Sequence, residues 1–240
     1  MTIQTDSDPD SNLGAPVPNW SPPPFPGRST LQGRYCRLEP LDPARHAQGL
    51  FDAWEGVDAL WDYMPIGPFA TAAEYRVFAD QVSAGADPQF YAVCDLDTGA
   101  PLGQASYLRI APEAGSIEVG WICFSPRLKR SRLATEAMYL MMKNAFNLGY
   151  RRYEWKCNAL NAASRRAAQR FGFSFEGVFR QATVSKGRNR DTAWYATIDS
   201  EWPALGSAFE QWLDPANFDA AGRQYRALST LTEPCLFAKG

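Results

Sequence analysis

Alternating apolar and polar residues fill several short stretches of the chain, and a period of two is the pattern of half-buried β-strands. Turn signals separate these stretches, for example Asp97, Thr98 and Gly99 between two of them. The pattern predicts strands at residues 35–38, 90–94, 101–108, 116–124, 151–157, 173–184 and 190–198.

Helical spacing of apolar residues marks most of the segments between these strands. Asp42 before Pro43, and Thr71 farther along, are signals for helix starts, whereas Gly149 and Gly172 are signals for helix ends. The predicted helices run from 43 to 53, from 71 to 83, from 132 to 147, from a cap at Asn161 to 171, and from 201 to 213. Strands and helices in this order indicate a mixed α/β sheet flanked by helices.

Composition divides the chain into three parts. Residues 1–32 are rich in Pro, Ser and Asp and should form an extended arm, with Trp20 and Phe25 placed to hold it against the surface. Residues 33–213 contain all the predicted strands and helices and should form one domain. Residues 214–240 are expected to be a loose C-terminal tail.

Charge and hydropathy exclude some functions. The chain has 240 residues and a formal net charge of −2, so it is not a general electrostatic partner for nucleic acid. No apolar run approaches the roughly 18 residues that a membrane span needs, and no secretory signal is visible. We therefore expect a cytoplasmic protein that binds neither nucleic acid nor a membrane.

The cysteines and the histidine argue against several kinds of site. The five cysteines include no CxxC pair, which indicates free thiols in a reducing compartment. His46 is the only histidine, which argues against a zinc site and against a Ser-His or Cys-His catalytic pair. We expect no metal, and we expect His46 to be a surface residue of the first helix.

A basic loop connects the predicted strand 116–124 with the long helix that follows. It carries Lys129, Arg130 and Arg132 at the start of this helix. The first N–H groups of a helix have no partners within the helix, and the helix dipole attracts anions there. The loop therefore suits the diphosphate of a nucleotide-type cofactor, although such charges can also be solvated surface residues.

Two motifs resemble those of the GCN5-related N-acetyltransferase (GNAT) superfamily. The family's cofactor loop, Gln/Arg-x-x-Gly-x-Gly/Ala, aligns with residues 129–134, and 135–137 (Thr-Glu-Ala) follow as in many members. The second motif, Asn-x-x-Ser and a helix ending in Gly-Phe, aligns with 161–164 and 171–173. Over residues 33–213 the chain looks most like the branch with the ribosomal-protein N-terminal acetyltransferases.

The resemblance implies a central, mostly antiparallel twisted sheet in which two neighbouring strands splay apart to hold an acyl-CoA, in the simplest case acetyl-CoA. One departure affects the loop, because Arg132 stands at the family's central glycine, and glycine permits unusual torsions and close approach. The cofactor-binding residues that the resemblance implies are Ile122, Phe124, Lys129, Arg130, Ser131, Arg132, Leu133, Ala134, Thr135 and Asn161.

Two residues are candidates for the chemistry. The resemblance implies that Ser164 hydrogen-bonds the departing sulfur, but its hydroxyl can also be a local helix cap. Glu118 is a candidate general base, with its pKa raised by burial, and it can equally be a structural carboxylate. The neighbours expected to bury Glu118 are Trp121, Tyr107 and Met64.

The acceptor side has weaker signals. The aromatic segment before residue 70 falls where the resembled fold builds its acceptor wall, and its rings can line that wall or belong to the core. The charged turn 186–190 can attract an acidic acceptor or be solvated. Related N-terminal acetyltransferases often carry a glutamate where this chain has Thr183, which weakens transfer of their mechanism. The candidate substrate-binding residues are Trp61, Tyr63, Phe69 and Trp121.

Three functional hypotheses follow. The first is an acyl-CoA-dependent N-acyltransferase that transfers acetyl from acetyl-CoA by direct attack of a primary amine, either a small molecule or a protein N-terminus. The second, motivated by Arg132 and Thr183, is a non-catalytic acyl-CoA-binding sensor or partner module. The third is an enzyme with another donor, such as a succinyl-type or carrier-protein-bound acyl group. The arm and the tail are each candidates for a homodimer contact.

Overall fold

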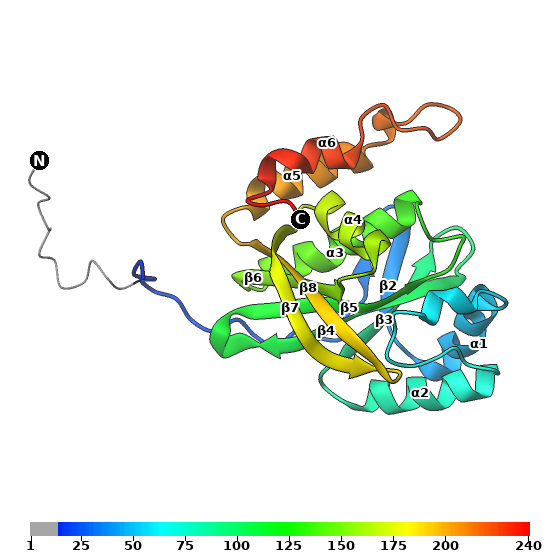
Figure 1. Cartoon of the computed structure of the whole chain (residues 1–240). Helices are drawn as coiled ribbons and strands as arrows, with labels where there is room; N and C mark the ends of the chain where they lie inside the picture. Colours follow the sequence, from blue (N-terminus) through cyan, green and yellow to red (C-terminus); the bar gives the residue numbers. More distant parts are fainter. Residues whose placement is uncertain (1–13) are drawn as a thin grey trace, which may run out of the picture.

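A computed structural model describes residues 14–240, and its centre is one eight-stranded sheet (Figure 1). The strand order is β1-β2-β3-β4-β5-β6-β8-β7. All neighbouring strands run antiparallel except β5 and β6, which are parallel. The strands are β1 (Leu31–Gln32), β2 (Cys36–Pro40), β3 (Gln89–Asp95), β4 (Pro101–Ala111), β5 (Ser116–Phe124), β6 (Arg152–Asn158), β7 (Ser174–Ser185) and β8 (Arg188–Ile198).

Helices cover the sheet, and none among the described residues is long and apolar enough to cross a membrane. They are α1 (Pro43–Trp54), α2 (Ala72–Ala84), α3 (Arg132–Asn147), α4 (Ala162–Arg170), α5 (Trp202–Leu213) and α6 (Leu228–Thr232). Short 3-10 turns are η1 (Asp58–Trp61), η2 (Pro112–Ala114), η3 (Pro215–Asn217) and η4 (Glu233–Cys235). The mixed sheet with its flanking helices confirms the predicted fold class.

The core is divided between the two faces of the sheet. The larger cluster joins α3 and α5 to one face, to which β5 contributes Ile117 and Val119. The smaller cluster joins α1 and α2 to the opposite face, where Phe90 and Cys123 are buried. Residues of one strand alternate between these clusters because successive side chains point to opposite sides of a sheet. We call the second side the α1/α2 face.

Helix starts follow the signals in the sequence. The Asp42 side chain accepts a hydrogen bond from the Ala44 N–H group at 2.9 Å, and the Thr71 hydroxyl accepts one from Glu74 at 3.2 Å. These bonds satisfy donors that have no partner within the helix. The predicted strand 116–124 and the predicted helix 132–147 agree with β5 and α3 at both ends.

The described part of the arm crosses the domain surface without regular structure until β1. Residues 1–13 of the predicted arm lie outside the described residues. Pro23 and Pro26 are buried, whereas Trp20 and Phe25 remain more than a third exposed. Three side chains of the domain donate hydrogen bonds to backbone carbonyl groups of the arm. The prolines and these bonds therefore hold the arm more than the two aromatic rings do.

The expectation of a loose tail is wrong. Residues 214–240 include α6 and pack on the domain, with Leu228 fully buried. The Phe175 N–H group at the start of β7 donates to the Ala238 carbonyl at 3.1 Å. The end of the chain thus lies along the outermost strand of the sheet.

Candidate active site

The parallel strands β5 and β6 diverge halfway along their length. They pair only as far as Val119 and Trp155, after which β6 continues on β8 while β5 continues on β4. Backbone groups of residues 120–124 that would face β6 in a regular sheet are therefore free to bind an extended chain, as an added strand would. This divergence, which we call the splay, confirms the predicted splayed strand pair.

A β-bulge lies on β5 next to the splay. The pairing of β5 with β4 shifts between Gly120 and Cys123, so that Trp121 and Ile122 together face one residue of β4. Trp121 has a φ of 52°, a left-handed value that is strained for a bulky residue. The bulge takes the backbone groups of Trp121 and Ile122 out of the regular ladder, where a ligand can use them.

The basic loop, residues 125–134, uses part of its own backbone in turns. The Lys129 N–H group donates to a carbonyl within the loop at 2.9 Å, and the Ser131 N–H group donates to Leu128 at 3.2 Å. The Ser131 hydroxyl caps α3 by accepting from the Ala134 N–H group at 3.0 Å. The N–H groups of Ser131 and Ala134 therefore already have partners.

Around the start of α3, three N–H groups have no partner in residues 14–240, namely those of Arg130, Arg132 and Leu133. Arg130 has a left-handed φ of 60°, and Arg132 and Leu133 open α3. Donors at a helix start, together with the positive end of the helix dipole, bind anions. The exposed side chains of Lys129 and Arg130 add positive charge, so the loop suits a diphosphate.

The Arg132 side chain is used in packing. Its guanidinium lies over the rings of Tyr35 at 5.2 Å and Phe218 at 4.5 Å. The Glu136 carboxylate, one turn later, accepts hydrogen bonds from the backbone N–H groups of residues 34–36 at 2.7 to 2.8 Å. An arginine at the family's glycine position thus leaves its own N–H group free and ties α3 to the C-terminal segment.

Asn161 and Ser164 begin α4 beside the splay. Asn161 accepts from the Ser164 N–H group at 3.0 Å, which confirms the predicted cap. The Ser164 hydroxyl accepts from the indole N–H of Trp155 at 3.0 Å, and Trp155 is the last residue of β6 that pairs with β5. Because this bond uses a lone pair of the hydroxyl oxygen, the hydroxyl proton of Ser164 can turn toward a sulfur atom bound in the splay.

Glu118 is 6% exposed and points to the α1/α2 face of β5. Its expected neighbour Tyr107 lies in the other core cluster, so that part of the expectation is wrong. Its carboxylate contacts Lys156 Nζ at 2.8 Å and Arg109 Nε at 3.4 Å. Burial raises the pKa of Glu118 above its ordinary value, and the two cations oppose this without cancelling it.

The aromatic residues before α2 divide into buried and exposed rings. Trp61 is 3% exposed and packs edge-on against Phe69 at 5.1 Å, and both line a cavity of about 320 Å³ beside α1. The ring of Trp121 packs against the same aromatic cluster. Tyr63 is 41% exposed, and its hydroxyl donates to the Leu160 carbonyl at 3.3 Å. This segment therefore reaches the loop between β6 and α4.

The β7–β8 hairpin also contacts this wall. Lys186 at its tip donates to the carbonyl groups of Trp61 at 2.9 Å and Gly67 at 2.7 Å. The lysine of the charged turn thus joins the hairpin to the wall, a contact between residues 125 positions apart that no local pattern reveals. Next to it, β7 bulges at residues 179–182 and lines a cavity of about 650 Å³.

Sequence reasoning also missed Lys156, which contacts Glu118. The signal was present in β6, where alternation puts Arg152, Glu154 and Lys156 on one side and apolar residues on the other. That pattern shows a charged row on a largely buried strand. It does not show that Glu118 of β5 lies opposite Glu154, because that depends on the register of two separate strands.

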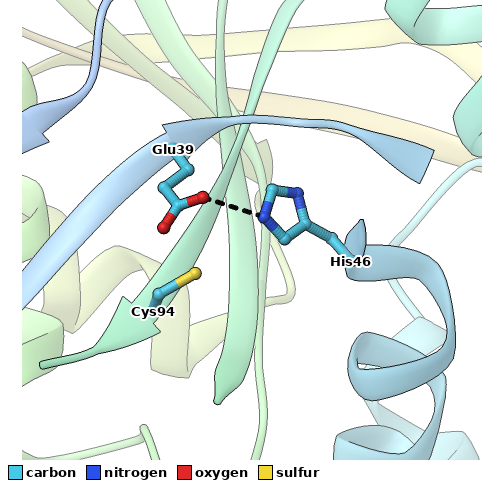
Figure 2. A group of neighbouring side chains, drawn as sticks. All are labelled: Glu39, His46 and Cys94. Carbon is cyan, nitrogen blue, oxygen red and sulfur yellow. Dashed lines mark hydrogen bonds and ion pairs between the residues drawn. The ribbon is translucent and has the colours of Figure 1, made fainter. Parts of the chain in front are cut away.

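One cluster has the residue types of a metal site. Glu39, His46 and Cys94 place their ligand atoms within 4.8 Å of one another (Figure 2). His46 is 3% exposed, so its expected surface position is wrong. Its Nδ1 accepts from the Asp42 N–H group at 3.0 Å, and its Nε2 lies 3.2 Å from the Glu39 carboxylate. The ring is therefore neutral with the proton on Nε2, and burial lowers the pKa of His46.

This cluster does not suit a metal ion. Both ring nitrogens of His46 are engaged, and Glu39 also forms ion pairs with Arg37 and with Arg45, the latter at 2.6 Å. Burial raises the pKa of the Cys94 thiol to about 11, which keeps it protonated. A metal would have to displace these bonds, so the cluster is a hydrogen-bonded anchor between α1 and the sheet.

Comparison with known proteins identifies the family. The family model described as an acetyltransferase (GNAT) domain matches residues 36–174, from the start of β2 to the start of β7. The chain belongs to the GNAT family of acetyltransferases. The match includes the splay and the basic loop, so the features built above are those of a GNAT acetyltransferase domain.

Individual relatives agree with this assignment. A GCN5-related N-acetyltransferase from Brucella melitensis is 47% identical, with a TM-score of 0.88 over 90% of this chain and 100% of that chain. YnaD of Bacillus subtilis (strain 168), an uncharacterized N-acetyltransferase, is 24% identical over 63% of this chain and 91% of its own length. RimL, a ribosomal L7/L12 alpha-N-protein acetyltransferase, shares the fold at 20% identity and a TM-score of 0.61, over 71% of this chain and 94% of its own.

Proposed function

We propose that this GNAT protein transfers an acetyl group from acetyl-CoA to a primary amine by direct attack. The observation that carries the proposal is the junction of the splay with the three free N–H groups around the start of α3. Acetyl-CoA combines a diphosphate with an extended amide-containing arm. The loop offers donors and positive charge for the first, and the open edge of β5 offers backbone partners for the second.

Individual residues take distinct parts in donor binding. The N–H groups of Arg130, Arg132 and Leu133 hold the diphosphate, and the Lys129 side chain adds charge. Backbone groups around Ile122 and Phe124 hold the amides of the arm. The remaining candidates act indirectly: Ser131 caps α3, Ala134 is buried under the loop, Thr135 bonds Arg170, and Asn161 caps α4.

The reaction forms a bond between the amine nitrogen and the thioester carbonyl carbon and breaks the carbon–sulfur bond. Glu118 takes the proton that the amine loses, since its raised pKa brings it nearer to that task. The Trp121 N–H group at the bulge polarises the carbonyl oxygen. The Ser164 hydroxyl donates to the departing sulfur from its fixed position next to Trp155.

The acceptor is a primary amine of a small molecule or of a protein N-terminus. It approaches along the α1/α2 face, where Tyr63, Phe69 and Trp121 supply aromatic surface and Trp61 supports them from the core. The five cysteines are free thiols, which supports a reducing compartment such as the cytoplasm.

The test is turnover by the full chain. Acetyl-CoA and a broad panel of amines, including peptides with free N-termini, should release free CoA, measured with a thiol reagent. CoA should also bind in calorimetry. Tight binding with no turnover by any acyl donor would instead support an acyl-CoA sensor, and faster turnover of succinyl-CoA with one acceptor would assign another donor. Failure to bind CoA would contradict the proposal.

A further inference from the structure

Lys156 lies where β5 and β6 separate. Its neighbour Trp155 forms the last pair with Val119 of β5, and Lys156 itself pairs only with Trp194 of β8. Its side chain points to the α1/α2 face, as does that of Glu118. A buried amine of the protein therefore sits at the vertex of the splay, although the proposed reaction assigns it no part.

Two carboxylates share this ammonium group. Glu118 and Glu154 are register partners on β5 and β6, and Lys156 Nζ lies 2.8 Å from the first and 2.9 Å from the second. The side chains are 8% exposed for Lys156, 7% for Glu118 and 12% for Glu154. Two neighbouring carboxylates with so little solvent cannot both ionise without a cation between them.

The surroundings of Lys156 hold it in this position. Its ammonium group lies 3.5 Å from the centre of the Trp194 ring, and this cation–π contact fixes the direction of the side chain. Arg109 of β4 also contacts Glu118, but its side chain is 60% exposed and its distance is longer. Solvent screens that second pair far more, so Lys156 is the principal partner of Glu118.

We infer that Lys156 is a positioning residue that keeps the Glu118 carboxylate ionised and oriented at the vertex of the splay. This inference rests on the proposed function insofar as an ionised Glu118 is needed as the base. The charged groups that face Glu118 are Lys156 and Glu154 from β6 and Arg109 from β4. Without Lys156, burial and the adjacent Glu154 would both favour a protonated Glu118, and a protonated carboxyl group cannot take a proton from an amine.

The inference can be tested without turnover. Protein labelled with ¹³C at the glutamate side-chain carboxyl groups is titrated by NMR, and the Glu118 resonance is assigned by its loss in Glu118→Gln. In Lys156→Met the titration midpoint of Glu118 should rise by more than about one pH unit. In Lys156→Arg, which keeps the charge, it should stay within about half a unit. A midpoint in Lys156→Met within about 0.3 unit of the wild type would overturn the inference.

Two controls keep this test decisive. Lys143→Met removes another lysine that contacts a carboxylate, on the far side of α3, and should leave the Glu118 midpoint unchanged. Lys156→Gln is a second neutral variant, in case Lys156→Met fails to fold, and it should shift the midpoint in the same direction. Glu154 is followed in the same spectra because adjacent carboxylates titrate as a coupled pair.

Kinetics then separate this inference from the proposed function. If Glu118 is the base, kcat/KM falls at low pH as Glu118 becomes protonated. In Lys156→Met, this fall (the acid limb of the pH profile) should shift to higher pH together with the NMR midpoint. A shifted midpoint with an unshifted acid limb would keep the inference about Lys156 and remove Glu118 from the proposed chemistry. An unshifted Glu118 midpoint in Lys156→Met would contradict the positioning role of Lys156. It would not contradict the proposal that the protein binds CoA and transfers an acetyl group.

Discussion

The two sides of the splay are built from different parts of the chain. On the side of the basic loop, the groups available for a ligand are backbone N–H groups, and side chains such as Arg132 and Glu136 hold the frame. On the α1/α2 face, the proposed chemistry depends on side chains, and Glu118 already has partners in Lys156 and Arg109. A substitution in the basic loop that does not introduce proline keeps the backbone N–H donors of that loop. On the α1/α2 face, by contrast, a single substitution of Glu118 or Lys156 changes the charge of the site.

The largest expected effect on activity comes from a substitution on the α1/α2 face, where the proposed chemistry depends on side chains. Glu118→Gln should lower kcat/KM by about 10²- to 10⁴-fold, the usual contribution of a general base, and should leave CoA affinity within about twofold. The pH profile supplies a second readout. The pKa of Glu118 is raised above its ordinary 4.5, and a base must be ionised, so wild-type kcat/KM should fall as the pH drops through this raised value. An unchanged rate in Glu118→Gln would assign the base elsewhere.

A smaller effect is expected from removing one backbone donor of the loop. Arg132→Pro deletes this N–H group at the first position of α3, where proline is tolerated and where the extended Ser131 (φ −96°, ψ 167°) suits a following proline. Arg132→Ala loses the same side-chain packing but keeps the N–H group. A lost hydrogen bond to an anion should weaken CoA binding by about tenfold or more in Arg132→Pro relative to Arg132→Ala. Equal affinities in calorimetry would show that this donor is not used.

Ser164→Ala should have a more modest effect on the reaction. Losing one donor to the departing sulfur should lower kcat by about tenfold, with KM and CoA affinity nearly unchanged. Thr71→Ala is the matched control, because it removes a capping hydroxyl of α2, outside the proposed donor site, and should cost only about 1 kcal/mol of unfolding free energy. Ser164→Ala with full kcat and a similar loss of stability would make Ser164 a structural hydroxyl only.

The smallest effect on activity is expected from the packing under the Arg132 side chain. Phe218→Ala removes the ring under the Arg132 guanidinium and should lower the free energy of unfolding by about 2 kcal/mol. CoA affinity should stay within about twofold, since the N–H group of Arg132 remains. Phe237→Ala is the control, because this ring is 91% exposed and its loss should leave the melting temperature unchanged. A large loss of CoA affinity in Phe218→Ala would show that this packing shapes the donor site.

Local signals predicted most of the fold. Caps at Asp42 and Thr71 and the period-two alternation of β5 act within a few residues, so the sequence carries them directly. The loop and its free N–H groups were predictable for the same reason, because a helix start leaves donors without partners whatever its side chains are.

Contacts between distant segments could not be predicted in this way. His46 belongs to the buried side of α1 because Glu39 of β2 lies opposite its ring, and nothing in the sequence of the helix shows this. The direction of the Arg132 side chain depends on Phe218, which lies in a segment expected to be loose. The partnership of Glu118 with Lys156 requires the register of β5 and β6.

The last residues of the chain have a consequence for handling this protein. β7 is an edge strand, and an open edge is a template on which other chains can add and aggregate. The backbone of Ala238 already occupies the start of that edge through its bond from Phe175, and the Phe237 N–H group is bound by Ser174 at 2.8 Å. A truncation that removes Phe237 and Ala238 would expose this part of the edge, so recombinant versions of the protein should keep these residues.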